Sequence, residues 1–276
     1  HGPTGNSYGY GYYDTTSISA DGRFVLVGAP AENKAYLYDT TQSSAPVFTF
    51  PTSSTNNYGI RCAMDDLSTK FAISDSDRIY FYERKSYDTD DWEIRNVAHH
   101  KLHLNHFKMS KDGSTLVVSP KFNSSTFTKW DLGLDWTQEP VASELSGTRV
   151  GGLDLSYDGS YIVAAEHIGP NEASMKIFYP GGNVEHTLTT RGHTHSFVIS
   201  DSPDTTGFFT VIVGETKPHG TTMTTAEFNI RKFHETTPET ITETPKSISG
   251  LYDTRYGRYA TMSYDGSLAV LSGTRE

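Results

Sequence analysis

Apolar runs separated by a short polar turn recur along the whole chain, and each pair of runs is typical of a β-hairpin. The turn reads Ser-x-Asp-Gly at residues 19–22, 110–113, 156–159 and 263–266. Two degenerate copies fill the gaps, at 65–68 and 202–207. Asp-Gly suits a tight turn because the turn requires a positive φ, which glycine adopts without steric cost and aspartate tolerates. The pattern therefore predicts six hairpins.

The spacing of these turns is nearly constant. Their aspartates are Asp21, Asp66, Asp112, Asp158, Asp204 and Asp265, separated by 45, 46, 46, 46 and 61 residues. The longer last interval predicts an insertion. We place it in the polar, proline-punctuated stretch 236–244, which we read as a loop.

Four strands are expected in each repeat. The strand after each turn is nearly continuous in apolar residues, as at 24–27, 116–118, 161–164 and 268–271, and is predicted to be covered on both faces. An aromatic third strand and a more polar fourth strand follow, for example 35–38 and 47–50. Four strands in a repeat of about 45 residues predict the blades of a β-propeller. The predicted fold class is all-β: a six-bladed β-propeller with four-stranded antiparallel blades, forming a single domain over residues 1–276.

The last blade is predicted to be incomplete. Its first strand is expected near 259–262 and its second near 268–271, close to the end of the sequence. The residues before the first blade suffice for one short strand at about 3.3 Å per residue. We therefore expect at most three strands in this blade. Its open edge should pair with a protein partner or with another copy of the chain.

The hairpin and aromatic pattern resembles WD-repeat-like propellers, and Lys129-Trp130-Asp131 matches the end of a WD strand. The first repeat also resembles the integrin-type FG-GAP blade, through 27–30 and 35–38. These resemblances imply a fold and carry no functional motif. Calcium-binding FG-GAP loops carry several alternating acidic residues, whereas most loops here supply one aspartate, which we read as a turn former. The denser clusters at 75–77 and 88–91 are read as solvated turns.

The composition of the chain limits the kinds of partner that it is expected to bind. The net charge of −10 disfavours nucleic acid and anionic membranes, because phosphate binding needs a basic surface. No apolar run approaches the roughly 20 residues that cross a bilayer, so no membrane insertion is expected. The single cysteine, Cys62, is read as a buried and inert thiol. A first residue other than Met and the sequon at Asn123, a candidate glycosylation site, favour an extracellular location, either secreted or on a particle surface.

The segments leading into the first strands are the candidate site. In a WD-like blade the first strand lies nearest the axis, so these segments should converge at one mouth of the channel. They are rich in His, Arg and Tyr although the chain is acidic, a combination that suits a carboxylate, a sulfate, an acidic peptide or a sugar. The alternative is that these residues pack the axis. The candidate ligand-binding residues are Tyr58, Arg61, His103, His106, Arg149, His193, His195, Arg255, Tyr256 and Arg258.

Metal binding and catalysis find less support in the sequence. His193 and His195 alternate on a presumed strand and would share one face, but zinc needs three or four converging ligands. We assign no metal, no cofactor and no catalytic residue.

The leading hypothesis is a noncatalytic recognition or assembly module that binds a protein or glycan partner at the channel mouth and at the open blade edge. Its support is the lack of a nucleophile elbow, a phosphate loop or a zinc motif. The alternative is a propeller-type polysaccharide lyase acting on acidic glycans. There, Arg would neutralise a uronate while His and Tyr exchange protons. An unsaturated, ultraviolet-absorbing sugar product would favour the lyase.

Overall fold

The computed structural model describes residues 15–42, 44–50, 56–86, 91–100, 104–120, 126–133, 141–144, 150–169, 172–189, 193–216, 225–249, 254–264 and 266–275. Within these ranges almost every element is a β-strand, and the one helical turn is η1 (Pro30–Glu32). No helix in this part of the chain has the length and apolar character needed to span a bilayer. The predicted all-β class is confirmed.

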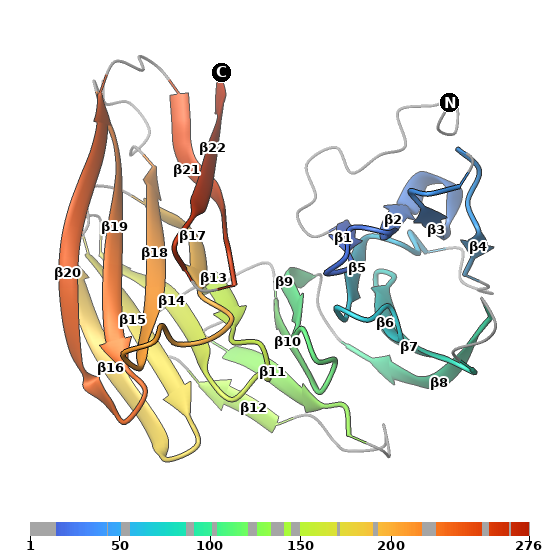
Figure 1. The fold of residues 1–276 in the computed structure, drawn as a ribbon, viewed down its shortest axis with the longest axis horizontal. Helices are drawn as coiled ribbons and strands as arrows, with labels where there is room; N and C mark the ends of the chain where they lie inside the picture. The colour runs from blue at the N-terminus through green and yellow to red at the C-terminus, as the bar shows by residue number, and fades with distance from the viewer. Residues whose placement is uncertain are drawn as a thin grey trace. The chain divides into compact units, whose positions relative to one another are not determined.

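Three four-stranded sheets come first along the chain (Figure 1). The first contains β1 (Thr16–Ile18), β2 (Phe24–Ala29), β3 (Lys34–Asp39) and β4 (Phe48–Thr49). The second contains β5 (Arg61–Met64), β6 (Lys70–Ser74), β7 (Arg78–Arg84) and β8 (Trp92–His99). The third contains β9 (Leu104–Met109), β10 (Thr115–Pro120), β11 (Thr126–Asp131) and β12 (Val141–Glu144).

Two further four-stranded sheets and one two-stranded sheet follow. The fourth contains β13 (Val150–Leu155), β14 (Ile162–Gly169), β15 (Glu172–Tyr179) and β16 (Gly182–Thr189). The fifth contains β17 (His193–Ile199), β18 (Phe208–Thr216), β19 (Thr225–His234) and β20 (Thr237–Ser249). The sixth contains β21 (Thr254–Met262) and β22 (Ala269–Arg275). In every sheet, strands that are consecutive in the chain are neighbours.

The chain divides into two compact units, which we describe separately. Unit 1 comprises residues 1–122 and 128–141, and unit 2 comprises residues 123–127 and 142–276. The first two sheets and most of the third belong to unit 1, and the last three sheets belong to unit 2. The expectation of one domain over residues 1–276 stays a prediction.

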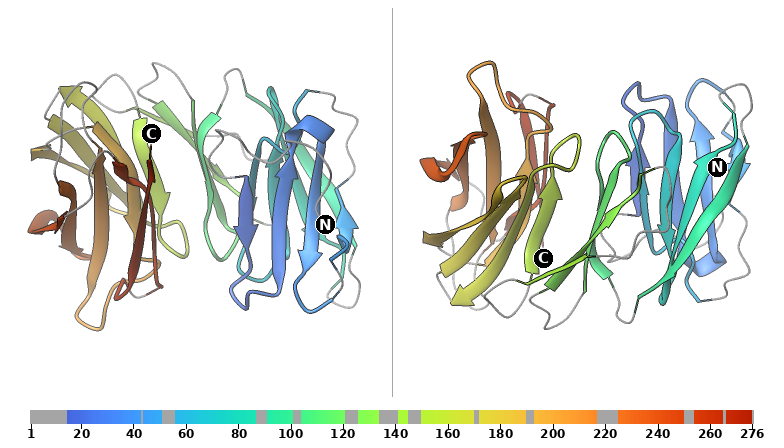
Figure 2. Two further views of the ribbon diagram at one scale, coloured as in Figure 1. Left: turned by 90° about the horizontal axis from the view of Figure 1, so that it is seen from above. Right: turned by 90° about the horizontal axis from the view of Figure 1, so that it is seen from below.

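The six sheets are the predicted blades of a β-propeller, the last of them incomplete. Within unit 1 the first strands β1, β5 and β9 pack in succession, and within unit 2 the first strands β13, β17 and β21 do so. Both views of Figure 2 show the first two sheets of unit 1 stacked face to face. Contact between successive first strands is the arrangement of the innermost strands of blades around a channel.

The repeat turns join the first and second strands of all six blades, as predicted. In each turn a backbone N–H donates to the carbonyl three residues earlier, as from Gly22 to Ser19 and from Gly266 to Ser263, both at 2.9 Å. The donor has a positive φ every time. It is a glycine in five turns, whereas Ser68, with φ 56°, stands there in the second blade.

Neighbouring repeat turns are tied together through their second residues. In unit 1 the N–H of Ala20 donates to the carbonyl of Asp66 at 3.1 Å, and the N–H of Asp66 donates to the carbonyl of Lys111 at 2.7 Å. These bonds use backbone atoms only. The side chains at this second position also meet between two of these turns, where Lys111 and Asp66 form an ion pair at 3.5 Å.

The stretch 236–244 is not the predicted loop. Residues 237–244 belong to β20, which pairs with β19 from Thr225 opposite Ser249 to His234 opposite Thr237. The prediction was wrong because it weighed polarity and proline above the β-branched threonines, which favour extended backbone. Proline is tolerated here because β20 is the outer strand of its sheet.

The core of each unit lies between neighbouring blades. In unit 1 one cluster joins the first and second blades and another joins the second and third, while a third cluster joins the fourth and fifth blades in unit 2. Leu116, Val117 and Val118 of β10 are all buried, so burial on both faces is confirmed for that second strand. Leu268 and Val270 are 66% and 59% exposed, so the same prediction was wrong for the sixth blade.

Candidate functional site

The first strands are interrupted by a β-bulge at one recurring place, five residues before the turn serine or its equivalent. The strand register shifts there in four blades, at Asn105, Gly151, His195 and the pair 257–258. In the second blade the N–H groups of Gly59 and Ile60 both donate to the carbonyl of Ser74, at 2.9 and 3.1 Å. Bulges re-aim side chains and are over-represented beside functional sites.

Four of the predicted ligand-binding residues occupy this bulged end. His195 and Arg258 lie at the bulge itself in β17 and β21, two strands of unit 2 that pack against each other. Arg61 and His106 directly follow the bulge in β5 and β9, which are neighbours in unit 1. Within each unit, then, the chain brings predicted residues to equivalent positions on adjacent first strands.

Arg61 is buried and joins two blades. Only 2% of the residue is exposed. Its Nη2 donates to the carbonyl of Leu104, the first residue of β9, at 2.8 Å, and its Nη1 donates to the carbonyl of Ile60 at 3.0 Å. These contacts fix the guanidinium against the backbone of the third blade. Arg61 therefore positions the bulged strands.

Asn105 and His106 form a side-chain pair beside Arg61. Asn105 is 8% exposed, and its Nδ2 lies 2.9 Å from Nε2 of His106. An amide N–H can only donate, so Nε2 of His106 accepts in this contact. The sequence did not single out Asn105. Its signal is the spacing of five residues before the turn serine.

For some of the other candidate residues the structure gives only the strand to which they belong, and the rest lie outside the described residues. His193 belongs to β17, and Arg255 and Tyr256 belong to β21. The register shift between Thr194 and Ser196 interrupts the regular alternation from which we placed His193 and His195 on one face. Their placement on one face stays a prediction. His103, Arg149 and the sequon residue Asn123 lie outside the described residues.

Tyr58 lies in the hydrophobic core. It is fully buried between the first and second blades, and its hydroxyl lies 2.6 Å from that of Tyr82. Its ring meets the ring of Tyr80 edge-on, with centroids 5.1 Å apart. Packing between the two blades therefore explains why a tyrosine stands at this position.

Small residues stand opposite the bulged ends. The second-strand position that faces the residue after the bulge is Ser74 in the second blade, Ser119 in the third and Ala165 in the fourth. Gly28 stands at the corresponding place in the first blade, where an added Cβ would lie 1.9 Å from the carbonyl oxygen of Gly59. The bulged strand of the next blade thus approaches too closely for a larger side chain.

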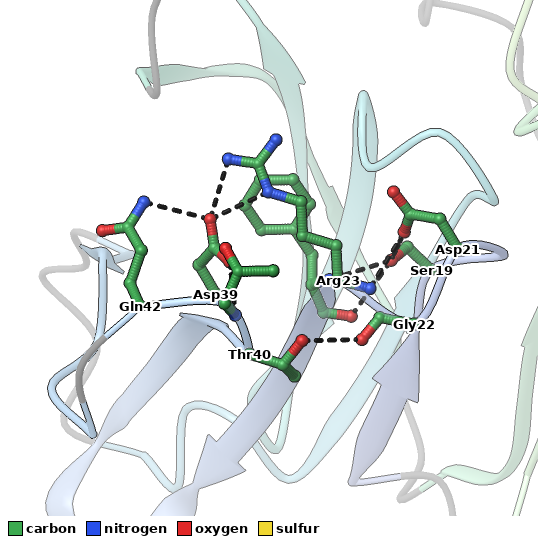
Figure 3. Close-up of polar contacts among 9 residues, drawn as sticks. Ser19, Asp21, Gly22, Arg23, Asp39, Thr40 and Gln42 are labelled. Carbon is green, nitrogen blue, oxygen red and sulfur yellow. Dashed lines mark hydrogen bonds and ion pairs between the residues drawn. The ribbon is translucent and has the colours of Figure 1, made fainter.

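A polar network secures the turn end of the first blade (Figure 3). Asp39, at the end of β3, accepts hydrogen bonds from Nε of Arg23 at 2.9 Å and from Nε2 of Gln42 at 3.0 Å. The backbone and hydroxyl of Thr41 also donate to it. The hydrogen bonds from Arg23 and Thr41 hold the pKa of Asp39 well below its usual range. The network ties the third strand to the repeat turn and is structural.

The acidic cluster at 75–77 behaves as a turn former, whereas most of the cluster at 88–91 lies outside the described residues. Asp75 is 3% exposed, and its Oδ1 accepts the N–H groups of Asp77 and Arg78, both at 2.7 Å. Residues 75–77 therefore form a turn, but its first carboxylate is buried, contrary to the expected solvated turn. No group of three or more His, Cys, Asp or Glu that could bind a metal occurs among the described residues.

Comparison with known proteins places the fold. No protein-family model matches the chain, and no curated protein matches its sequence. A chain in the crystal structure of the mitotic checkpoint complex is similar, with a TM-score of 0.65 and 14% identity over 94% of this chain and 70% of that one. A chain of Kuenenia stuttgartiensis hydrazine synthase is also similar, with a TM-score of 0.68 and 13% identity over 98% of this chain and 75% of that one. Likeness at this level of identity supports the β-propeller fold alone.

Proposed function

We propose that the chain is a noncatalytic recognition or assembly module, outside the cell or on a particle surface, that binds an extended segment of a partner protein along β22. The observation that carries this proposal is the outer edge of β22. Among the described strands, the sixth sheet contains only β21 and β22, whereas every other sheet contains four. An edge without a neighbour presents backbone N–H and C=O groups with which a partner strand can pair.

The outer strands of the other five blades carry features that discourage such pairing. β4 is two residues long and β12 is four residues long. β8 is bulged at Arg95, which forms an ion pair with Glu83 at 2.7 Å. β16 contains Glu185, and β20 contains Pro238 and Pro245. Short length, bulges, charges and proline are the devices by which proteins protect sheet edges.

β22 lacks these features. It is seven residues long, reads Ala-Val-Leu-Ser-Gly-Thr-Arg, and contains neither proline nor a charge before Arg275. The two residues that interrupt its ladder with β21, at 257 and 258, belong to β21. Exposed Leu268 and Val270 provide apolar surface beside the edge. A strand added here would gain both backbone hydrogen bonds and apolar contact.

The similar solved structures are compatible with this proposal. One of them is part of an assembly, the mitotic checkpoint complex, and the other belongs to hydrazine synthase. The fold therefore serves both binding and enzymatic proteins, and the argument for binding rests on the edge.

The test uses binders selected from a display library of random decapeptides against the whole chain. Selected peptides should alternate apolar and polar residues, because one face of an added strand packs and the other is solvated. Hydrogen exchange of the β22 amides that face the free edge should be fast in the free chain and slow in the complex. Selected peptides that protect other segments, and never β22, would end the proposal.

A pair of neighbouring proline variants supplies the control. Successive N–H groups of an antiparallel strand point alternately to its two neighbours, so of Val270 and Leu271 one N–H faces β21 and the other faces the free edge. We therefore compare Val270→Pro with Leu271→Pro. The variant that removes the N–H facing the free edge should keep the melting temperature of the wild type and should no longer bind the peptide. A variant that stays folded in this way and binds as the wild type does would contradict edge pairing.

The bulged ends of β17 and β21 form a second contact surface in this proposal, suited to an acidic glycan. The support is that His195 and Arg258 share the bulge position on neighbouring strands. Titration with a uronate oligosaccharide should give measurable binding that the His195→Ala/Arg258→Ala variant weakens. The same incubation followed in the ultraviolet separates binding from the lyase alternative, because only a lyase releases an unsaturated sugar.

A further inference from the structure

Two tyrosines from different blades of unit 2 meet over the repeat turn of the blade between them. Tyr157 in the fourth blade and Tyr264 in the sixth have ring centroids 5.8 Å apart at an interplanar angle of 75°. The fifth blade is hydrogen-bonded to both tyrosines through backbone atoms. The N–H of Tyr157 donates to the carbonyl of Asp201 at 2.7 Å, and the N–H of Ser202 donates to the carbonyl of Tyr264 at 3.3 Å.

The backbone hydrogen bonds between neighbouring turns do not require these rings. Both tyrosines occupy the second position of a repeat turn, where the side chains of Lys111 and Asp66 form an ion pair at 3.5 Å in unit 1. The same position in unit 1 is filled by Ala20, Asp66 and Lys111. Tyr264 is nevertheless 55% exposed. Exposed aromatic side chains that packing does not explain are enriched where proteins bind partners.

The charge around the tyrosine pair indicates the chemistry of the partner. The three repeat turns of unit 2, residues 156–160, 200–207 and 263–267, contain four aspartates and no Lys, Arg or His. Lys232 of β19 pairs with one of these aspartates, Asp204, at 3.0 Å, so the turns keep an excess of negative charge. The repeat turns of unit 1 and the residues that directly follow them include Arg23, Lys70 and Lys111. A cationic group with a flat face fits this surface best, because it stacks on a tyrosine ring and is attracted by carboxylates nearby.

We propose that the Tyr157–Tyr264 pair is a docking surface for an arginine-bearing segment of a protein partner. The guanidinium stacks on the exposed face of Tyr264, and the carboxylates of the flanking turns attract it. Lysine fits less well because its ammonium is a compact, strongly hydrated charge without a planar face. This surface is separate from the β22 edge, so either one can fail without the other.

The test measures fluorescence polarisation of a labelled octapeptide that repeats Arg-Gly. Binding should be about tenfold weaker for the Tyr157→Ala/Tyr264→Ala variant, and the Lys-Gly octapeptide should bind the wild type more weakly than its arginine counterpart. The alanine variant keeps the net charge of the chain, so general attraction between an acidic protein and a basic peptide is unchanged. The loss therefore reports the rings.

Three controls complete the experiment. Tyr157→Phe/Tyr264→Phe should bind as the wild type does, because the stacking face remains. Tyr38→Ala, at a partly exposed tyrosine of β3 in unit 1, should also leave binding unchanged. Peptides that bind the β22 edge should bind the alanine variant normally. Equal binding of the arginine and lysine peptides, an alanine variant that binds normally, or preference for neutral cellohexaose over the arginine peptide would overturn the proposal.

Discussion

The hydroxyl oxygens of Tyr58 and Tyr82 lie 2.6 Å apart in the core between the first and second blades. Burial raises the pKa of both phenols, so both stay protonated, and one hydroxyl donates while the other accepts. Neither group can reach water, since Tyr58 and Tyr82 are both fully buried. Within the described residues, the hydroxyl of Tyr58 thus depends on Tyr82 for its hydrogen bond.

Tyr82→Phe should lower the free energy of unfolding by about 1–2 kcal/mol, because it leaves the Tyr58 hydroxyl buried without its partner. Urea denaturation measures this change. The Tyr58→Phe/Tyr82→Phe variant should be no less stable than the single variant, since no hydroxyl is then left unsatisfied. A double variant that loses the sum of the two single effects would show that the pair is not coupled.

Asp39 should make the first blade sensitive to acid. Its folded pKa lies below the ordinary value of 3.8, so its contacts with Arg23 stabilise the fold above that pH, and this contribution is lost as the pH falls below it. Asp39→Asn should therefore lower the melting temperature at neutral pH by roughly a few degrees. The difference from the wild type should narrow as the pH falls below 3.8.

Asp131 supplies the matched control for this experiment. It ends β11 as Asp39 ends β3, but it is exposed and pairs with Lys129 at 3.1 Å. Exposed ion pairs contribute little to stability. Asp131→Asn should therefore change the melting temperature much less than Asp39→Asn at every pH, and equal effects would show that burial of Asp39 is not what matters.

Cys62 should be inert in the native protein. Only 2% of the residue is exposed, and burial raises the pKa of its thiol, so the reactive thiolate is suppressed. A colorimetric disulfide reagent such as DTNB at mildly alkaline pH should label the denatured chain completely while the native chain stays unlabelled. Fast stoichiometric labelling without denaturant would place the thiol at the surface.

The sequence reveals this fold where local geometry dictates residue type. A positive φ at the end of each repeat turn selects glycine, and the regular recurrence of that turn fixes the number of blades. Gly28 is a second signal of the same kind, because the carbonyl of Gly59 in the next blade approaches it closely. The sequence analysis overlooked this signal.

Features that depend on context were harder to infer. A tyrosine at position 58 is compatible with a ring that faces a channel and with a ring in the core. The packing between two blades determines which of the two occurs. The threonines of 236–244 are polar, yet β20 is an extended strand because its backbone forms hydrogen bonds with the long neighbouring strand β19. The bulge at His195 inserts one extra residue and so changes the strand register. A regular alternation of apolar and polar residues does not reveal such an insertion.

The repeat turn of the second blade contains a residue that the fold disfavours. Ser68 has a φ of 56°, where the other five turns have glycine, and a side chain there costs roughly 1–2 kcal/mol in the left-handed region. Its hydroxyl is also buried and, within the described residues, makes no hydrogen bond. Its carbonyl accepts the indole N–H of Trp92 at 3.3 Å, a contact that glycine would keep.

Ser68→Gly should therefore raise the free energy of unfolding by about 1 kcal/mol, the relief of strain outweighing the greater freedom of glycine in the unfolded chain. The reverse change in the next blade, Gly113→Ser, should destabilise. The φ of Gly113 is 69°, and an added Cβ would lie 3.0 Å from Cβ of Asp65 and 3.1 Å from Cδ of Lys70. Urea denaturation of both variants decides the matter. If Ser68→Gly destabilises the protein while Gly113→Ser is harmless, the two turns cannot share the backbone conformation that defines the repeat.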